Sequence, residues 1–194
     1  MACEAKGCTG RWQEGQDQPP RFDIDRPATA GEVEAMERQI GRPLPAAFRR
    51  VLLDVARAVR VEWQLPEEVS PPEDCGDIFA GECLWDLKEV PALLDHHQSW
   101  IDSFDEATGW PADWWNAKWH KTFPVLDVGT GDQIAIDLDH ARTGGGEPVV
   151  YLSHDGDDTL RGAELGASFE DYIDRLTRLG CVGSEGWQLE VFIH

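Results

Sequence analysis

The sequence predicts an α+β fold in a single domain, with a mostly antiparallel, twisted sheet flanked by two N-terminal helices and one C-terminal helix. Two patterns predict it. Apolar residues recur at helical spacing near both ends of the chain, and between them apolar and polar residues alternate as in half-buried strands. The nine tryptophans among 194 residues indicate a folded chain, because disordered chains are poor in aromatic residues.

Start and stop signals define the helices. Thr29 and Glu32 fit a capping box, in which the Thr oxygen accepts from a free backbone amide and the Glu side chain reaches back. Gly41 ends this first helix, and a second helix follows after a Leu-Pro step. Ser168 caps the last helix, and a short helix is expected over residues 90–101.

Strands are expected where apolar and polar residues alternate or where apolar residues run together. They cover residues 59–65, 78–79, 84–87, 122–128, 133–138, 148–153 and, as an edge strand, 187–193. Residues 129–132, Gly-Thr-Gly-Asp, have the composition of a tight hairpin turn, because glycine tolerates positive φ.

The N-terminal part of the chain shows no periodicity. Residues 1–27 are rich in Gly, Gln, Pro and charge, which predicts a flexible arm. We therefore expect one domain over residues 28–194.

Charge narrows the range of partners. The chain carries 37 acidic and 17 basic residues, a formal net charge of −20. Nucleic acid and anionic membranes are disfavoured, because binding phosphate needs Lys and Arg to displace counterions. A basic protein partner is favoured, although the acidity would also be explained by solubility alone.

Two further patterns concern location and redox state. No apolar run reaches the roughly 18 residues of a membrane span, and the N-terminus lacks an apolar signal core. We therefore expect a cytoplasmic protein. The five cysteines include no C-x-x-C pair, so free thiols are expected.

Four sequence pieces in a fixed order resemble one known family. They are Glu34 with Ile40, Gly41, Pro43, Leu44, Pro45 and Phe48; Trp85 in a strand before a helix; Gly129, Gly131 and Asp132 with residues 134–138; and Pro148–Tyr151 with His154, Asp155, Ser168 and Phe169. This set resembles the SUKH superfamily, which contains bacterial immunity proteins and the fungal Smi/Knr cell-wall regulators. The resemblance spans about residues 30–180 and leaves residues 181–194 as a C-terminal extension. It implies an α+β fold and a protein-binding role, which in bacteria means neutralising a toxin.

Some residues could carry metal chemistry. Asp137, Asp139 and His140 offer oxygen and nitrogen ligands for a metal-dependent hydrolase, but polar residues are also expected at a strand end. Residues 154–158 have alternate carboxylates and a glycine without the closing Glu of a calcium loop, so a solvated acidic turn or a partner contact fits them better. His96 and His97 diverge by about 100° on a helix and make a poor chelate.

Catalytic residues are not predicted. Ser153, His154 and Asp155 are neighbours in sequence, which rarely converge into a triad, and no nucleophile-elbow glycines flank the serine. We expect no enzyme activity, no cofactor and no resident metal.

Tryptophans and acids are the candidate contact residues for a partner. Four tryptophans lie between residues 110 and 119, too close together for all to be buried, and exposed Trp is the commonest anchor at protein interfaces. An aromatic mini-core is the alternative. The candidates are Trp110, Trp114, Trp115, Asp132, Asp137, Asp139, Asp155, Asp157 and Asp158.

Together these patterns predict a non-enzymatic protein-binding module. We interpret it as an immunity protein, or antitoxin, that neutralises a cognate, basic toxin domain. The alternatives are a cytoplasmic adaptor or regulatory protein of the same fold and, as a minor one, the metal-dependent hydrolase. The oligomeric state is not predicted.

Overall fold

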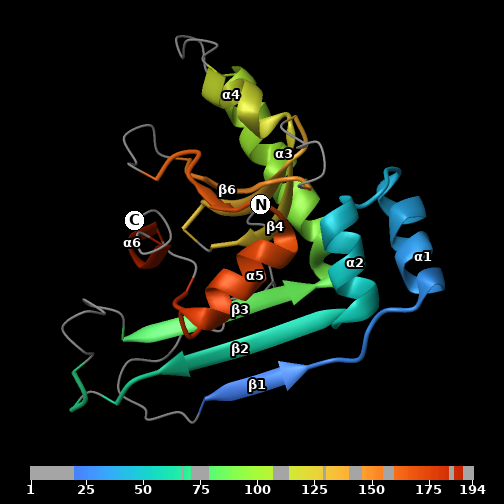
Figure 1. Cartoon of the computed structure of the whole chain (residues 1–194). Helices are drawn as coiled ribbons and strands as arrows, with labels where there is room; N and C mark the ends of the chain where they lie inside the picture. Colours follow the sequence, from blue (N-terminus) through green and yellow to red (C-terminus); the bar gives the residue numbers. More distant parts are fainter. Residues whose placement is uncertain are drawn as a thin grey trace, which may run out of the picture.

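The described part of the chain forms two antiparallel sheets with helices packed around them (Figure 1). The computed structural model describes residues 20–66, 68–70, 79–106, 114–128, 130–139, 146–154, 160–183 and 186–189. The three-stranded sheet contains β1 (Arg21–Ile24), β2 (Ala58–Gln64) and β3 (Ala80–Asp86), in that order. The four-stranded sheet contains β4 (Thr122–Asp127), β5 (Gln133–Asp137), β6 (Val149–Leu152) and β7 (Glu164–Gly166), in that order.

The helices are α1 (Ala30–Ile40), α2 (Ala46–Asp54), α3 (Val90–Glu106), α4 (Trp114–Trp119), α5 (Phe169–Arg178) and α6 (Gly186–Leu189), and a 3-10 turn (Leu87–Glu89) precedes α3. The predicted α+β class is confirmed, although the strands divide into two sheets.

Local signals place the helix ends as predicted. The capping box is present: the backbone N–H of Glu32 donates to Thr29 Oγ1, and the N–H of Thr29 donates to Glu32 Oε2 at 2.8 Å. Gly41 ends α1 with φ 72°, and Ser168 Oγ accepts from the N–H of Asp171 at the start of α5. Helix α3 runs to Glu106, beyond the expected end at residue 101, because Ile101 and Phe104 continue its buried stripe.

The three strands expected at 122–128, 133–138 and 148–153 are confirmed within one or two residues as β4, β5 and β6. The piece expected near 84–87 belongs to a longer strand, β3, which begins at Ala80; Phe79 of the other expected piece lies just before it, and Ile78 lies outside the described residues. Strand β3 pairs with β2 along its full length, from Ala80 opposite Gln64 to Asp86 opposite Ala58.

The expected edge strand over 187–193 is wrong where the structure describes it, because residues 186–189 form the helical turn α6. The turn packs Leu189 into the core and lets the Gln188 side chain donate to the carbonyl of Ala80, at the start of β3. The remaining residues of that prediction lie outside the described ranges.

The flexible arm predicted over 1–27 is wrong at its C-terminal end. Residues 21–24 form β1, which pairs with β2 from Arg21 opposite Glu62 to Ile24 opposite Val59. The N–H of Asp25 continues this pairing by donating to the carbonyl of Ala58. Residues 1–19 lie outside the described residues.

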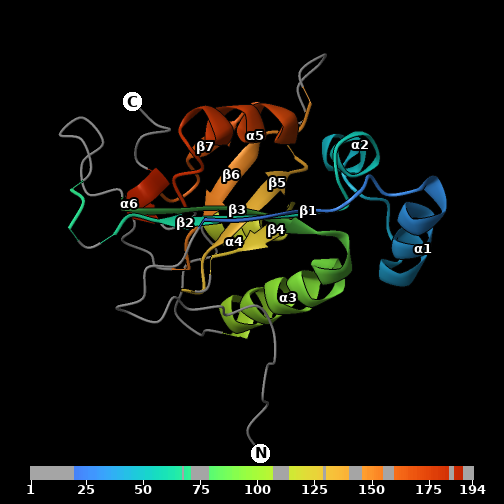
Figure 2. The same ribbon diagram turned by 90° about the horizontal axis from the view of Figure 1, so that it is seen from below.

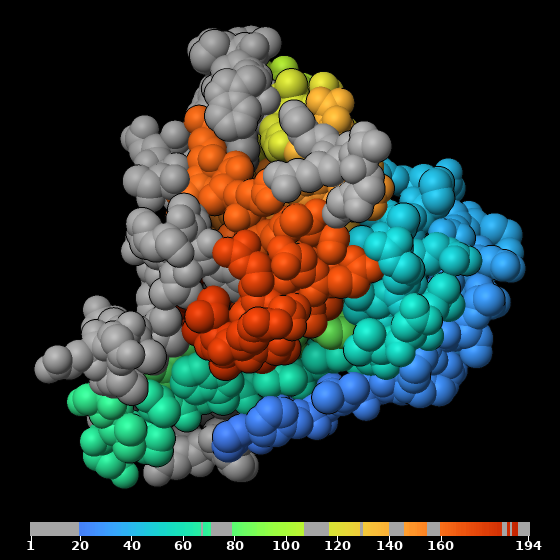
Figure 3. All heavy atoms as spheres, in the orientation of Figure 1, coloured from blue at the N-terminus to red at the C-terminus, as the bar shows by residue number. Residues whose placement is uncertain are grey.

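Helices cover both faces of the four-stranded sheet. Figure 2 shows α3 on one side of it and α5 on the other, and Figure 3 shows α5 filling the space between the two sheets. The α5 side holds the larger apolar cluster, which includes Ile134 and Ile136 from β5. The α3 side holds a smaller cluster that includes Ala135, Phe104 and Trp119. Alternate residues of β5 therefore enter different clusters, as the period of a strand requires.

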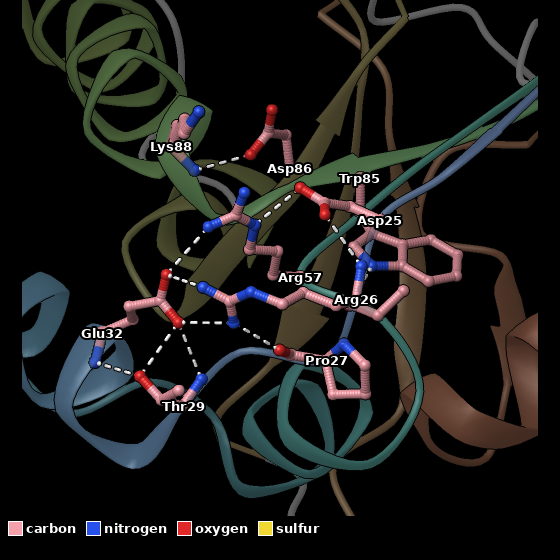
Figure 4. A network of polar contacts seen from close by, with 10 residues as sticks. Asp25, Arg26, Pro27, Thr29, Glu32, Arg57, Trp85, Asp86 and Lys88 are labelled. Atoms are coloured by element: carbon pink, nitrogen blue, oxygen red, sulfur yellow. Dashed lines mark hydrogen bonds and ion pairs between the residues drawn. The ribbon is translucent and has the colours of Figure 1, made fainter.

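A charged network joins the two chain segments that lead into the three-stranded sheet (Figure 4). Arg57, between α2 and β2, donates to Asp25 at 2.6 Å and to Glu32 at 2.8 Å. Arg26 also donates to Glu32, at 2.7 and 2.9 Å. The hydrogen bonds from Arg26, Thr29 and Arg57 hold the pKa of Glu32 far below its usual range. Glu32 of the capping box is thereby linked, through Arg57, to the segment that leads into β2.

We predict that Leu52→Ala lowers the free energy of unfolding by about 2–5 kcal/mol, because the side chain is fully buried and its loss leaves a cavity. The matched control is Leu179→Ala, whose side chain is 40% exposed and should change stability by less than about 0.5 kcal/mol. Urea denaturation measures both. Equal losses from the two variants would contradict this description of the core.

Candidate partner-binding site

The structure separates the predicted acidic candidates into two groups at opposite ends of β5. Asp132 directly precedes the strand, Asp137 is its last residue, and Asp139 lies two residues further on. Trp114 and Trp115 form the first turn of α4. Trp110, Asp155, Asp157 and Asp158 lie outside the described residues.

Asp132 is buried, and its carboxylate is used inside the protein. It accepts from the Tyr151 hydroxyl at 2.6 Å and from the backbone N–H of His154 at 2.8 Å, and its Oδ1 lies 2.7 Å from His154 Nδ1. Burial opposes ionisation, but these hydrogen bonds outweigh it and lower the pKa of Asp132. The carboxylate therefore fixes the end of β6 against the turn between β4 and β5.

Asp137 is also buried and forms an ion pair with Lys118 of α4. Its other oxygen accepts from the backbone N–H of Asp139 at 3.0 Å. The Asp139 side chain is exposed and pairs with Lys121 at 2.9 Å. The buried pair anchors α4 to the end of β5 and so positions the helix that carries Trp114 and Trp115. Contact of Asp132 or Asp137 with a partner stays a prediction.

Two imidazole–carboxylate pairs flank one tryptophan on the side of α3 that faces the β4–β5 turn. The ring centroid of His154 lies 4.9 Å from that of Trp100, and the ring centroid of His96 lies 6.3 Å from it. His96 Nδ1 lies 2.5 Å from Asp127 Oδ2, and His154 Nδ1 lies 2.7 Å from Asp132 Oδ1. Each imidazole uses Nδ1 for its carboxylate, and both side chains are about one-third exposed.

Sequence reasoning missed this cluster. His96 and Trp100 are four residues apart, which places them on the same side of a helix, and this spacing is the signal that could have found them. Their neighbours Asp127 and His154 come from β4 and the end of β6, so only the tertiary fold brings them together. His97, as expected, diverges from His96: it points inward to Gln133 and the carbonyl of Trp119. Burial lowers the pKa of His97.

The outer face of α3 is acidic. Exposed carboxylates stand at Asp95, Asp102, Asp105 and Glu106, and the helix contains no Lys or Arg. The last three lie in its final turns, where the unsatisfied carbonyls already give the helix a negative end. The bonds described for them are one from the Gln98 amide to Asp102 and a 3.2 Å pair of His120 with Asp105. This arrangement weakens the helix end, because the carboxylates add negative charge where the helix is already negative.

A family model described as SMI1 / KNR4 family (SUKH-1) matches residues 27–175. The chain belongs to the SMI1/KNR4 (SUKH-1) family. The suspected SUKH resemblance is thus confirmed. No curated protein and no solved structure gave a significant match.

The SUKH-1 match includes most of the candidate surface. Helix α3, Asp132 and His154 lie inside it, as do α4 and β4 to β6. Strand β1 and the residues after 175 lie outside it. The described parts of this SUKH-1 chain that precede and follow the match include β1, which pairs with β2 of the three-stranded sheet, away from α3 (Figure 2).

Metal and membrane sites can be assessed for the described part of this SUKH-1 chain. Within those residues, no three His, Cys, Asp or Glu side chains are placed to hold a metal ion. Of the hydrolase set, Asp137 and Asp139 are paired with lysines, and His140 lies outside the described residues. None of the described helices has the length and apolar content needed to cross a membrane.

We predict that Asp132→Asn destabilises the protein at pH 7 by about 1–3 kcal/mol, because the buried hydroxyl and imidazole lose a charged acceptor. The pKa of Asp132 is lowered in the folded state, so its contribution is present above the unfolded-state value of about 3.9 and is lost as the pH falls through the folded-state pKa. The difference in unfolding free energy between wild type and variant, measured by urea denaturation, should shrink below about pH 4.

The control is Asp139→Asn, which removes an exposed ion pair and should cost less than about 1 kcal/mol. A gap for Asp132→Asn that stays constant down to pH 2 would contradict the charged role of its carboxylate.

Proposed function

We propose that this SUKH-1 chain is a non-enzymatic protein-binding module that acts in the cytoplasm as an immunity protein, neutralising a cognate basic toxin domain. The observation that carries the proposal is the acidic outer face of α3: its four exposed carboxylates lie on a helix that contains no Lys or Arg. The net charge of −20 gives the whole molecule a field of the same sign. Such a field speeds the approach of a basic partner and disfavours nucleic acid.

Anchoring residues flank the acidic face. Trp100 is partly exposed beside it, between His96 and His154. A partly exposed Trp suits the centre of an interface, where a few aromatic residues supply much of the binding energy. At the C-terminal end of α3, α4 brings Trp114 and Trp115, and Trp110 lies in the segment between the two helices.

Other acidic candidates adjoin this region in the sequence. Asp155, Asp157 and Asp158 directly follow His154 in the sequence, and exposed Asp139 lies beyond the end of β5. Asp132 and Asp137 support it from within, by fixing His154 and α4. We propose that the partner contacts α3, the exposed acids around it and the tryptophans of the α3–α4 region, so that its basic active site is covered.

The arrangement around His154 favours binding over catalysis. Its pairing with Asp132 resembles the orienting half of a catalytic triad, but the adjacent Ser153 hydroxyl is buried and closed to a substrate. The ring of His154 packs against Trp100, an aromatic ring that cannot act as a nucleophile.

The proposal is tested in cells by co-expressing this chain with the toxic product of the neighbouring gene. Survival of the cells, with a one-to-one complex on purification, is the expected result. Death of the cells despite abundant folded chain would reject the immunity role for that pair. Capture of a housekeeping protein instead, from source cells at low salt, would support the adaptor of the same fold.

We predict that the double variant Asp95→Lys, Asp102→Lys slows association with the basic partner by about tenfold or more at low salt, because it reverses the local field. The matched control makes the same change in net charge elsewhere, with Glu34→Lys on α1 and Asp174→Lys on α5, both more than half exposed. Stopped-flow association rates at two ionic strengths measure both pairs. Equal slowing by the two pairs would show that net charge acts without a specific face.

We predict that Trp115→Ala raises the dissociation rate more than it lowers the association rate, as expected for an anchor that leaves a hole in a formed interface. An increase of about tenfold corresponds to 1.4 kcal/mol of lost binding energy. Surface plasmon resonance gives both rates, and Trp114→Ala is measured beside it. The thermal melt of each free variant serves as the control; unfolding without any change in dissociation would favour the aromatic mini-core.

A further inference from the structure

Two cysteines far apart in the sequence lie together under the three-stranded sheet. Cys83 is in the middle of β3, and Cys181 follows the end of α5. Both are buried in the same apolar cluster, both are free thiols, and their side chains share a hydrogen bond.

The fold presses the backbone around Cys181 directly onto this sheet. A Cβ atom at Gly81 of β3 would lie 1.9 Å from the carbonyl oxygen of Cys181, so only glycine permits the approach. The indole of Trp63 on β2 donates to the carbonyl of Gly180 at 2.6 Å and lies 3.1 Å from that of Cys181. Gln188 adds a bond to Ala80 at the start of β3. The two thiols therefore meet through a rigid set of backbone contacts.

The backbone at Cys181 is itself unusual. Its φ of 57° is the one positive value for a non-glycine residue in the described ranges. A side chain with a Cβ atom adopts this left-handed region only at a cost, which glycine at the same position would avoid. The neighbouring turn positions Gly180 and Gly183, with φ 73° and 74°, do carry glycine. Of these three positions with positive φ, the backbone strain therefore falls on Cys181, the one that carries a thiol.

The two sulfurs have different ionisation properties. The hydrogen bond from Cys83 lowers the pKa of Cys181 to about 7, despite partial burial. The same bond, together with burial, raises the pKa of Cys83 far above its usual range. Since the thiolate is the reactive form of cysteine, Cys181 is suited to attack and Cys83 to follow.

We propose that Cys83 and Cys181 form a redox-active dithiol site, which small-molecule disulfides of the glutathione class convert to an intramolecular disulfide. The Cys181 thiolate attacks one sulfur of the oxidant, forms a mixed disulfide and releases one small thiolate. That thiolate takes the proton of Cys83, whose sulfur then attacks the Cys181 sulfur and releases the second small thiolate. Two protein thiols are oxidised, and one small disulfide is reduced to two thiols.

The disulfide would tie a segment outside the family match to the sheet. Cys181 lies beyond residue 175, where the match ends, and Cys83 lies well inside it. Closing so long a loop restricts the unfolded chain, so the oxidised protein should melt at a higher temperature than the reduced one. The site is separate from the acidic face of α3 and does not depend on the proposed partner.

The experiment uses the full chain with Cys3, Cys8 and Cys75 replaced by Ser, so that two thiols remain. The native protein is treated with oxidised glutathione at neutral pH, digested and examined by mass spectrometry, and its melting temperature is measured. We expect a linked Cys83–Cys181 peptide, a raised melting temperature, and reversal of both by dithiothreitol.

Single variants separate the two roles. Cys83→Ala should accumulate a stable glutathione adduct on Cys181, since the second step is removed. Cys181→Ala should form an adduct on Cys83 slower by on the order of tenfold or more. Equal adduct rates in the two variants would overturn the assignment. Formation of the linked peptide only in urea would overturn the site itself. This experiment keeps both Cys83 and Cys181, so its result does not depend on whether a core variant folds.

Discussion

The burial of β5 on both faces is the constraint from which the rest of the structure follows. Its five residues are all buried, with Ile134 and Ile136 on the α5 side and Ala135 on the α3 side. A strand of this kind cannot have one face in water, so a helix layer must close over each side. Helix α3 meets this need with Ile101 and Phe104, and its opposite face is thereby left exposed to solvent.

The same constraint explains why two groups of acids behave differently. At the ends of a buried strand, Asp132 and Asp137 can stay charged only with partners, which Tyr151, His154 and Lys118 provide. These buried carboxylates hold His154 and helix α4 in place at the surface. The acids on α3 have few such bonds and add charge to the negative end of a helix, which favours an external counter-charge.

The three-stranded sheet has a different role. The family match begins after β1 and ends before the segment that carries Cys181, so one edge strand of this sheet and a segment packed against the sheet lie outside that match. Contacts of Trp63 and Gln188 hold the C-terminal segment on it, as Arg57 holds its other end to α1. The proposed binding surface on α3 and the proposed dithiol site at the sheet therefore lie in separate layers of one fold.

Local signals in the sequence determined the capping box at Thr29, the end of α1 at Gly41, and the strands of the second sheet, because each depends on residues a few positions apart. Strand β1 has no such signal: its four residues are exposed, and only pairing with β2 makes it a strand. Residues 186–189 alternate like a strand yet form a helical turn, since Gln188 and Leu189 gain contacts that way. The cluster of His96, Trp100 and His154 and the pairing of Cys83 with Cys181 were likewise decided by tertiary structure alone. Both groups join segments that are distant in the sequence. These segments meet only when helices cover the two faces of β5 and when the chain after α5 packs on the three-stranded sheet.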